Sequence, residues 1–121
     1  MSLKILAVDD SRTMRDMIRM TLEPAGFEVH TADDGVHGVD VLSGLIPDVI
    51  ITDINMPRMD GFGFIDAVRE QKMHKVTPIL VLTTEAAPEL KMRARNAGAT
   101  GWIVKPFDPV KLIKALQMVA G

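Results

Sequence analysis

The sequence predicts an α/β protein in which five parallel strands form an open sheet with helices on both faces. Short apolar runs rich in β-branched residues alternate five times with longer segments of helical periodicity. The runs at 49–52 and 79–82 are apolar on both faces, as expected for central parallel strands that are covered on two sides. Right-handed crossovers between successive parallel strands then produce a doubly wound (βα)5 arrangement with three layers, α/β/α.

The five strands are expected at residues 3–8, 28–32, 49–52, 79–82 and 101–104. Each is a short apolar run of the length usual for strands, and the run at 28–32 is the weakest. Pro47 and Pro78 stand just before the third and fourth runs and separate them from the preceding segments.

The segments between and after the strands carry helix start and stop signals. The expected starts are marked by Ser11, Gly35, Asp60-Gly61, Pro88 and Asp108-Pro109, and the expected stops by Pro24, Gly44 and Gly98. In the first helix Met14, Ile18 and Leu22 recur at helical spacing, which predicts its buried face. Gly38 lowers the helix propensity of the second segment, 35–44.

Length and composition suit one domain spanning residues 1–121. The chain is 47% hydrophobic and 25% charged, has a formal net charge of -2 and contains no cysteine. Disulfide and thiolate chemistry are therefore excluded, and no overall basic field favours nucleic acid or an anionic membrane. The start of the chain lacks the pattern of a secretory signal, and no apolar run reaches the length of a membrane span. We expect a cytoplasmic, soluble monomer.

Histidine and methionine carry no metal-site pattern. The spacing of His30, His37 and His74 does not suit metal ligation, so we expect these side chains at the surface. Met14 and Met17 stand at helical spacing and are expected to fill the core.

Acidic residues follow the first and third strands. Asp9 and Asp10 end the first strand and Asp53 ends the third. In the flavodoxin-like strand order 2-1-3-4-5 these strands are neighbours, at the switch point where doubly wound sheets bind ligands. Three converging carboxylates repel by about 4 kcal/mol per close pair at an effective dielectric of about 20. One aspartate alone is commonly a helix cap, but three here predict a Mg²⁺ site, since Mg²⁺ suits carboxylates, water and phosphate oxygens.

Two later strand ends add a hydroxyl and an ammonium group. Thr83 closes the fourth strand, and Lys105 follows the fifth. A lysine after an apolar run either extends to solvent or faces an anion. Beside three carboxylates, these groups suit a phosphoryl group whose negative charge grows during transfer. The Lys105-Pro106 bond belongs to the class in which cis isomers occur, and the sequence leaves its isomer open.

Together these residues make the chain resemble a response-regulator receiver domain over essentially its whole length. The matching segments are Val8-Asp9-Asp10-Ser11, Asp53-Ile54-Asn55-Met56-Pro57, Asp60-Gly61, Thr83 and Lys105-Pro106-Phe107. Any one of them is a weak signal, whereas all five in this order and spacing are specific. Within the family, residues 10–15 and the absence of an output segment most resemble chemotaxis regulators of the CheY type.

The resemblance implies that Asp53 is the phosphoacceptor and that Mg²⁺ is the cofactor, with no organic cofactor. It implies direct metal ligation by Asp10 and Asp53, ligation by Asp9 mostly through water, and ligation by the backbone carbonyl of Asn55. Asn55 and Glu85 occupy positions that tune hydrolysis of the aspartyl phosphate in the family, and their identities match rapidly dephosphorylating chemotaxis regulators.

The resemblance also implies a switch. Thr83 and Lys105 would contact the phosphoryl oxygens, and movement of Thr83 would vacate space for the aromatic residue at position 102. Trp102 stands where the family usually has Tyr or Phe, and its bulk opposes easy rotation inward. Thr84 stands where a small residue is common, so it narrows access to the phosphoryl site.

The implied partners are a CheA-like histidine kinase as phosphodonor, an output protein such as a flagellar motor switch protein, and a phosphatase. The output surface would consist of the fourth helix, the fifth strand and the fifth helix. Lys91, Lys111 and Lys114 lie on those helices and suit an acidic partner, although they equally suit a solvated face. The chain would contribute catalytic groups to its own phosphorylation and dephosphorylation without being an enzyme in the usual sense.

Three other functions are weighed against this one. The sequence does not distinguish a receiver with direct output from one that serves as a phosphate sink or relay intermediate. A phosphohydrolase with an aspartyl nucleophile would place Asp-x-Asp after the first strand, where this chain has Asp9-Asp10. A dinucleotide-binding protein would need a glycine-rich turn at the same place, which residues 8–12 lack.

Overall fold

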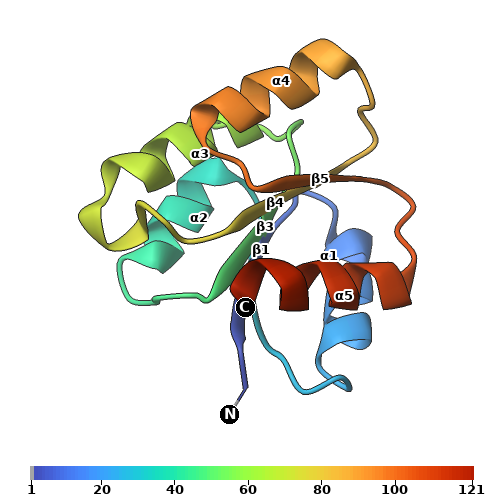
Figure 1. Ribbon diagram of the computed structural model, residues 1–121. Coiled ribbons are helices and arrows are strands. Elements are labelled where there is room, and N and C mark those ends of the chain that lie inside the picture. Colours follow the sequence, from blue (N-terminus) through green and yellow to red (C-terminus); the bar gives the residue numbers. More distant parts are fainter. Residues whose placement is uncertain (1) are drawn as a thin grey trace.

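The computed structural model describes residues 2–121 and confirms the predicted α/β architecture. Within this range, five parallel strands form one sheet in the order β2-β1-β3-β4-β5. The elements in chain order are β1 (Lys4–Val8), α1 (Arg12–Leu22), β2 (Glu28–Ala32), α2 (Gly35–Leu42), β3 (Val49–Thr52), α3 (Gly61–Glu70), the short 3-10 helix η1 (Lys72–His74), β4 (Ile79–Thr83), α4 (Pro88–Ala97), β5 (Gly101–Val104) and α5 (Pro109–Ala120). Figure 1 shows α1 and α5 on one face of the sheet and α2, α3 and α4 on the other.

The core has two parts because side chains of a strand point alternately to opposite faces of the sheet. In β1, Ile5 and Ala7 pack with apolar residues of α1 and α5, whereas Leu6 and Val8 pack with those of α2 and α3. All four side chains are at most 1% exposed. Burial on both faces explains why the central strands read as continuous apolar runs.

Most predicted boundaries are confirmed, with small shifts at two ends. The first strand begins at Lys4 and the second helix ends at Leu42, whereas the fourth strand closes at Thr83 as expected. Gly38, expected to weaken that helix, has a packing role. A Cβ atom at this position would lie 2.7 Å from Cε1 of Phe64, so glycine permits the close approach of α2 and α3.

Three of the residues that were expected to mark helix ends do so in the structure. The side chains of Ser11 and Asp60 accept hydrogen bonds from backbone N–H groups in the first turns of α1 and α3. Gly98 ends α4 in the left-handed region, with φ of 114°.

Two expectations about the burial of side chains are wrong. His74 is only 1% exposed at the end of η1, where Arg69 also donates to the His74 carbonyl oxygen at 2.8 Å. Among the described residues, its Nδ1 has no hydrogen-bond partner. Met17 is 42% exposed because the buried stripe of α1 follows Ile18 and Leu22, and Met17 falls beside that stripe.

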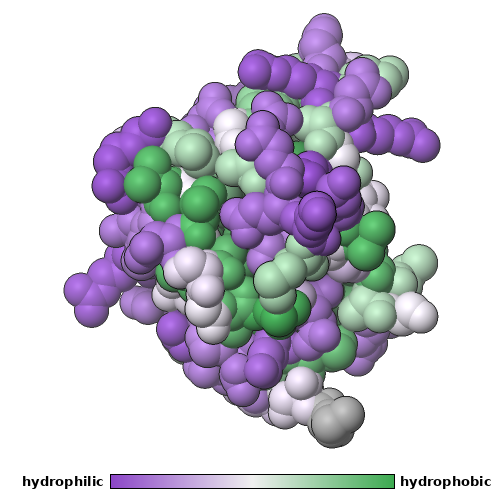
Figure 2. Space-filling model, turned by 90° about the vertical axis from the view of Figure 1, so that its left-hand side faces the viewer, coloured by the Kyte–Doolittle hydropathy of each residue, from purple (hydrophilic) through white to green (hydrophobic). Residues whose placement is uncertain are grey.

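The surface is mixed in character. Figure 2 shows hydrophilic side chains over most of the face at the left of Figure 1, interrupted by a broken band of apolar groups. In residues 2–121, no helix has both the length and the apolar character needed to cross a membrane.

Candidate functional site

The three predicted carboxylates converge at the carboxyl ends of β1 and β3. Val8 and Thr52 are paired in register across these strands, so Asp9 and Asp53 leave the sheet side by side. One carboxylate oxygen from each of Asp9, Asp10 and Asp53 lies within 4.8 Å of the others. Asp9 and Asp53 are 2% and 8% exposed, whereas Asp10 is exposed to solvent. The cluster therefore has two buried members and one that faces the surface.

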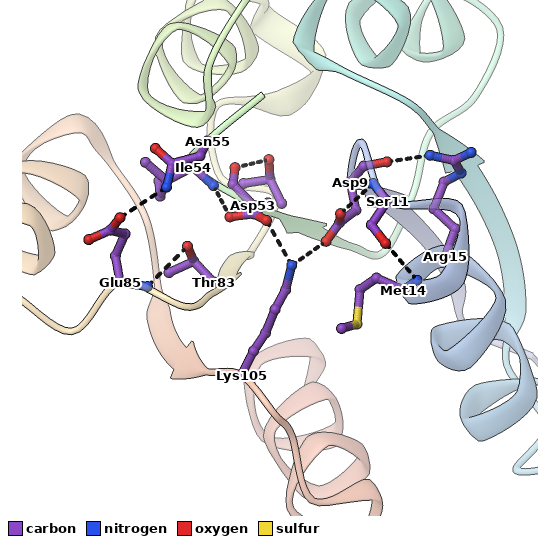
Figure 3. Close-up of polar contacts among 11 residues, drawn as sticks. Asp9, Ser11, Met14, Arg15, Asp53, Ile54, Asn55, Thr83, Glu85 and Lys105 are labelled. Atoms are coloured by element: carbon purple, nitrogen blue, oxygen red, sulfur yellow. Dashed lines mark hydrogen bonds and ion pairs between the residues drawn. The ribbon is translucent and has the colours of Figure 1, made fainter. Parts of the chain in front are cut away.

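Lys105 lies between the two buried carboxylates. Its Nζ donates to Oδ2 of Asp9 and to Oδ2 of Asp53, each at 2.7 Å (Figure 3). The lysine side chain is 10% exposed, so of the two alternatives for this residue, it faces the anions. The Lys105-Pro106 peptide bond, which the sequence left open, is cis.

Burial and charge oppose each other in this cluster. Burial raises the pKa of Asp9, and hydrogen bonds from Lys105 and Ser11 offset that effect only in part. Burial alone would lower the pKa of Lys105, but hydrogen bonds and charges from Asp53 and Asp9 outweigh it and raise this pKa. The lysine therefore stays charged, which compensates part of the repulsion between the acids.

Local hydrogen bonds hold the two buried aspartates in place. The backbone N–H of Ser11 donates to Oδ1 of Asp9 at 2.9 Å, and Arg15 donates to the Asp9 carbonyl oxygen at 2.6 Å. The N–H of Ile54 donates to Oδ1 of Asp53 at 2.6 Å. Sequence reasoning missed the role of Arg15, for which its position one turn into the helix after the acidic pair was the available signal.

Another predicted member of the site, Thr83, is fully buried at the end of β4. Its Oγ1 accepts a hydrogen bond from the backbone N–H of Glu85 at 3.4 Å. β4 pairs with β5, and the N–H of Lys105 donates to the Thr83 carbonyl oxygen at 2.7 Å. Thr83 and Lys105 thus reach the same edge of the sheet as the acids.

Glu85 connects the residues that were predicted to tune and to switch the site. The amide Nδ2 of Asn55 donates to Oε1 of Glu85 at 3.0 Å, which links the segment after β3 to the segment after β4. The indole Nε1 of Trp102 donates to the Glu85 carbonyl oxygen at 2.9 Å. Trp102 is half-buried against the core on the α3 and α4 side. Neither hydrogen bond was foreseen from the sequence.

The donor set fits a hard divalent cation. Three carboxylates that each place an oxygen within 4.8 Å of the others offer the oxygen ligands that Mg²⁺ prefers, and the exposed Asp10 leaves the cluster open to water. The nearby ammonium of Lys105 neutralises only part of the acidic charge, because the cluster holds three carboxylates and one lysine. The residues present therefore suit Mg²⁺ together with an oxyanion.

Comparisons with known proteins agree with this geometry. The family model described as response regulator receiver domain matches residues 5–117. Chemotaxis protein CheY1 of Helicobacter pylori is 40% identical over 98% of this chain and 98% of its own length. The solved structure of chemotaxis protein CheY4 of Vibrio cholerae is 52% identical, with a TM-score of 0.95 over 98% of this chain and 99% of that one. A receiver domain of sensor histidine kinase PA1611 from Pseudomonas aeruginosa, described with a magnesium ion in its active site cleft, is 27% identical with a TM-score of 0.92, covering 100% of this chain and 99% of that one.

Proposed function

This chain belongs to the response regulator receiver domain family, and from that premise we propose that it is a chemotaxis switch phosphorylated on Asp53. Members of the family are signalling proteins that receive a phosphoryl group from a histidine kinase and act on an output target. In the proposal, residues 1–121 act as one receiver domain in the cytoplasm, with a CheA-like kinase as donor. The observation that carries it is the bridge from Lys105 to Asp9 and Asp53 beside the exposed Asp10.

The proposed division of labour follows the contacts in the site. Asp53 lies at the centre, bonded to Lys105 and to the N–H of Ile54, so its carboxylate is held in one orientation. Asp10 and Asp53 would bind Mg²⁺ directly, Asp9 mostly through water, and Asn55 through its backbone carbonyl. The metal would neutralise negative charge on the transferring group.

In the proposed transfer, a carboxylate oxygen of Asp53 forms a bond to phosphorus while the bond from phosphorus to the imidazole nitrogen of the donor histidine breaks. Lys105 already lies 2.7 Å from Asp53, so its ammonium is in place to face the phosphoryl oxygens as their charge grows. The hydroxyl of Thr83 would donate to another of these oxygens. Asn55 and Glu85, joined by a hydrogen bond, would set how fast water removes the phosphoryl group.

The proposed output is a change of the surface formed by α4, β5 and α5. Thr83 and Trp102 are both in contact with Glu85, so a movement of Thr83 towards the phosphoryl group has a short path to the indole. A pocket of about 360 Å³ next to Trp102 is lined partly by Lys91 and Arg95 of α4. These charges, with the exposed Lys111 and Lys114 of α5, suit an acidic segment of a partner such as a flagellar motor switch protein.

The experiment that tests the proposal is intact-mass measurement after incubation with acetyl phosphate and Mg²⁺. The wild type should gain the mass of one phosphoryl group, in a form that base releases, whereas Asp53→Asn should gain none. Asp66→Asn, an exposed aspartate of α3, is the matched control and should label as the wild type does. Full labelling of Asp53→Asn would place the acceptor elsewhere, with Asp10 the first residue to examine.

A second measurement separates motor output from a phosphate sink or relay intermediate. Affinity capture of a motor switch protein should improve when the chain is phosphorylated. Efficient phosphorylation with no gain in capture would favour the sink.

A further inference from the structure

The segment between β3 and α3, residues 53–60, carries Asn55 and runs outside the described sheet after the hydrogen bond from the N–H of Asp53 to the Val8 carbonyl oxygen. Its backbone is constrained at one unusual point. Arg58 has φ of 63°, in the left-handed region that side-chain-bearing residues seldom adopt. Such a conformation persists only where surrounding contacts hold it, and the side chain of Arg58 makes contacts of that kind.

Those contacts are made with Asp34, the residue that caps the N-terminus of α2. Nε of Arg58 donates to Oδ2 of Asp34 at 2.6 Å, and an Nη donates to Oδ1 at 3.0 Å, which is a two-pronged arginine–carboxylate pair. Asp34 is 3% exposed, and its Oδ1 also accepts from the backbone N–H of His37 as the helix cap. The hydrogen bond from Arg58 lowers the pKa of Asp34, so the pair is ionised at neutral pH.

A backbone contact beside the pair holds the same segment to α2. The N–H of Gly35 donates to the carbonyl oxygen of Met59 at 3.2 Å. A Cβ atom on Gly35 would lie 2.7 Å from Cγ of Met59, so the approach is possible only for glycine. The far end of the segment is tied by the N–H of Gly61, which donates to the carbonyl oxygen of Ile54 at 2.8 Å.

We propose that Arg58 and Asp34 are positioning residues for the metal, and that their ion pair sets the path of the segment so that the Asn55 carbonyl faces the acidic cluster. This inference rests on the proposed function, which makes that carbonyl a Mg²⁺ ligand. Two residues separate Asn55 from Arg58. The hydrogen bond from Asn55 to Glu85 constrains the side-chain amide of Asn55, so the direction of its backbone carbonyl depends on the path of the backbone. Because Mg²⁺ demands near-ideal octahedral geometry, a displaced carbonyl weakens binding.

The test is isothermal titration of Mg²⁺ into four proteins: wild type, Arg58→Asn, Asp34→Asn and the double variant. Asparagine tolerates the left-handed region at 58, and it retains helix capping at 34, so each change removes the ion pair with little else. Each single variant should bind Mg²⁺ about tenfold more weakly, the lower end of the cost of losing an outer-shell partner of a metal ligand. The double variant should be no weaker than the singles.

If only the charges mattered, the two single variants would change Mg²⁺ affinity in opposite directions. The direction of each change therefore distinguishes a general charge effect from the positioning role. Removing the positive charge of Arg58 would strengthen binding of a cation, and removing the negative charge of Asp34 would weaken it. Arg95→Ala and Asp66→Asn, exposed residues on α4 and α3, measure these general effects. Arg58→Lys keeps the charge without the fork and should restore part of the affinity.

Tighter or unchanged Mg²⁺ binding by Arg58→Asn, with circular dichroism showing a folded protein, would overturn the positioning role while leaving the proposed function intact. Additive losses in the double variant would also overturn it, because they would mean that the two residues act separately. A wild type that binds no Mg²⁺ would overturn the proposed function and this inference with it. Equal, non-additive losses would establish the pair.

Discussion

The indole Nε1 of Trp102 donates to the backbone carbonyl oxygen of Glu85 at 2.9 Å, which ties strand β5 to the segment after β4. Glu85 also donates its N–H to Oγ1 of Thr83 and accepts from Asn55 through its carboxylate. The tryptophan is therefore one hydrogen-bonded residue away from both Thr83 and the segment that follows Asp53. Inward movement of the indole must either break its hydrogen bond to Glu85 or carry the segment after β4 with it.

Activation should change the fluorescence of Trp102, the only tryptophan of the chain. With a beryllofluoride mimic of the phosphoryl group, we expect a blue shift of emission and slower quenching by iodide, because the half-buried indole becomes more buried. Mg²⁺ alone should have little effect. Thr83→Ala should leave labelling possible and emission nearly unchanged on activation. Flat emission from the fully activated wild type would show that Trp102 is not the moving part.

Mg²⁺ should stabilise the fold by mass action, by about 2.7 kcal/mol at a concentration of one hundred times Kd. Asp10→Asn removes a proposed direct ligand and part of the repulsion among three carboxylates. Its stability without metal should therefore rise slightly, and its dependence on Mg²⁺ should fall. A melting-temperature series against Mg²⁺ measures both effects. Identical series for the variant and the wild type would remove Asp10 from the metal site.

Lys105→Arg should separate phosphorylation from output. Arginine keeps the positive charge, but its planar fork cannot reproduce an ammonium that is 2.7 Å from both Asp9 and Asp53. We expect labelling to proceed and coupling to weaken. A gain in partner affinity on activation of about fivefold or more, typical of coupled sites, should shrink to about twofold or less in the variant. An unchanged gain, measured by titration with a motor switch protein, would exclude Lys105 from the coupling.

The pair of Arg58 and Asp34 should make stability depend on pH. The pKa of Asp34 in the folded protein is lowered from its ordinary value of 3.8, first by the hydrogen bond from Arg58. A lowered folded pKa contributes stability that is present above pH 3.8 and is lost as pH falls through the folded value. Urea unfolding should thus show wild type more stable than Asp34→Asn near neutral pH.

That stability difference should shrink below pH 3.8, as the carboxyl group takes up a proton and its ion pair with Arg58 is lost. Asp66→Asn serves as the comparison, since Asp66 is exposed. A constant gap between wild type and Asp34→Asn down to the acid limit would mean that ionisation of Asp34 does not stabilise the fold.

Local patterns in the sequence were sufficient to predict the elements and the general location of the site. Apolar runs marked the strands, and the end residues Asp9, Asp53 and Thr83 came directly from where those runs stop. Caps such as Ser11 and Asp60 were readable because the bond to a helix N-terminus spans only three residues. These features depend on neighbouring residues, so the sequence by itself determined them.

The tertiary structure decided which side chains meet. Lys105 and Asp9 are 96 positions apart, and only the strand order and register bring the lysine between Asp9 and Asp53. The Arg58 and Asp34 pair, 24 positions apart, depends in the same way on how α2 packs beside the segment after β3. Burial of His74 came from a three-residue turn too short to leave a periodic pattern. Such contacts arise from packing over the whole fold, because their partners share no local spacing that a sequence pattern records.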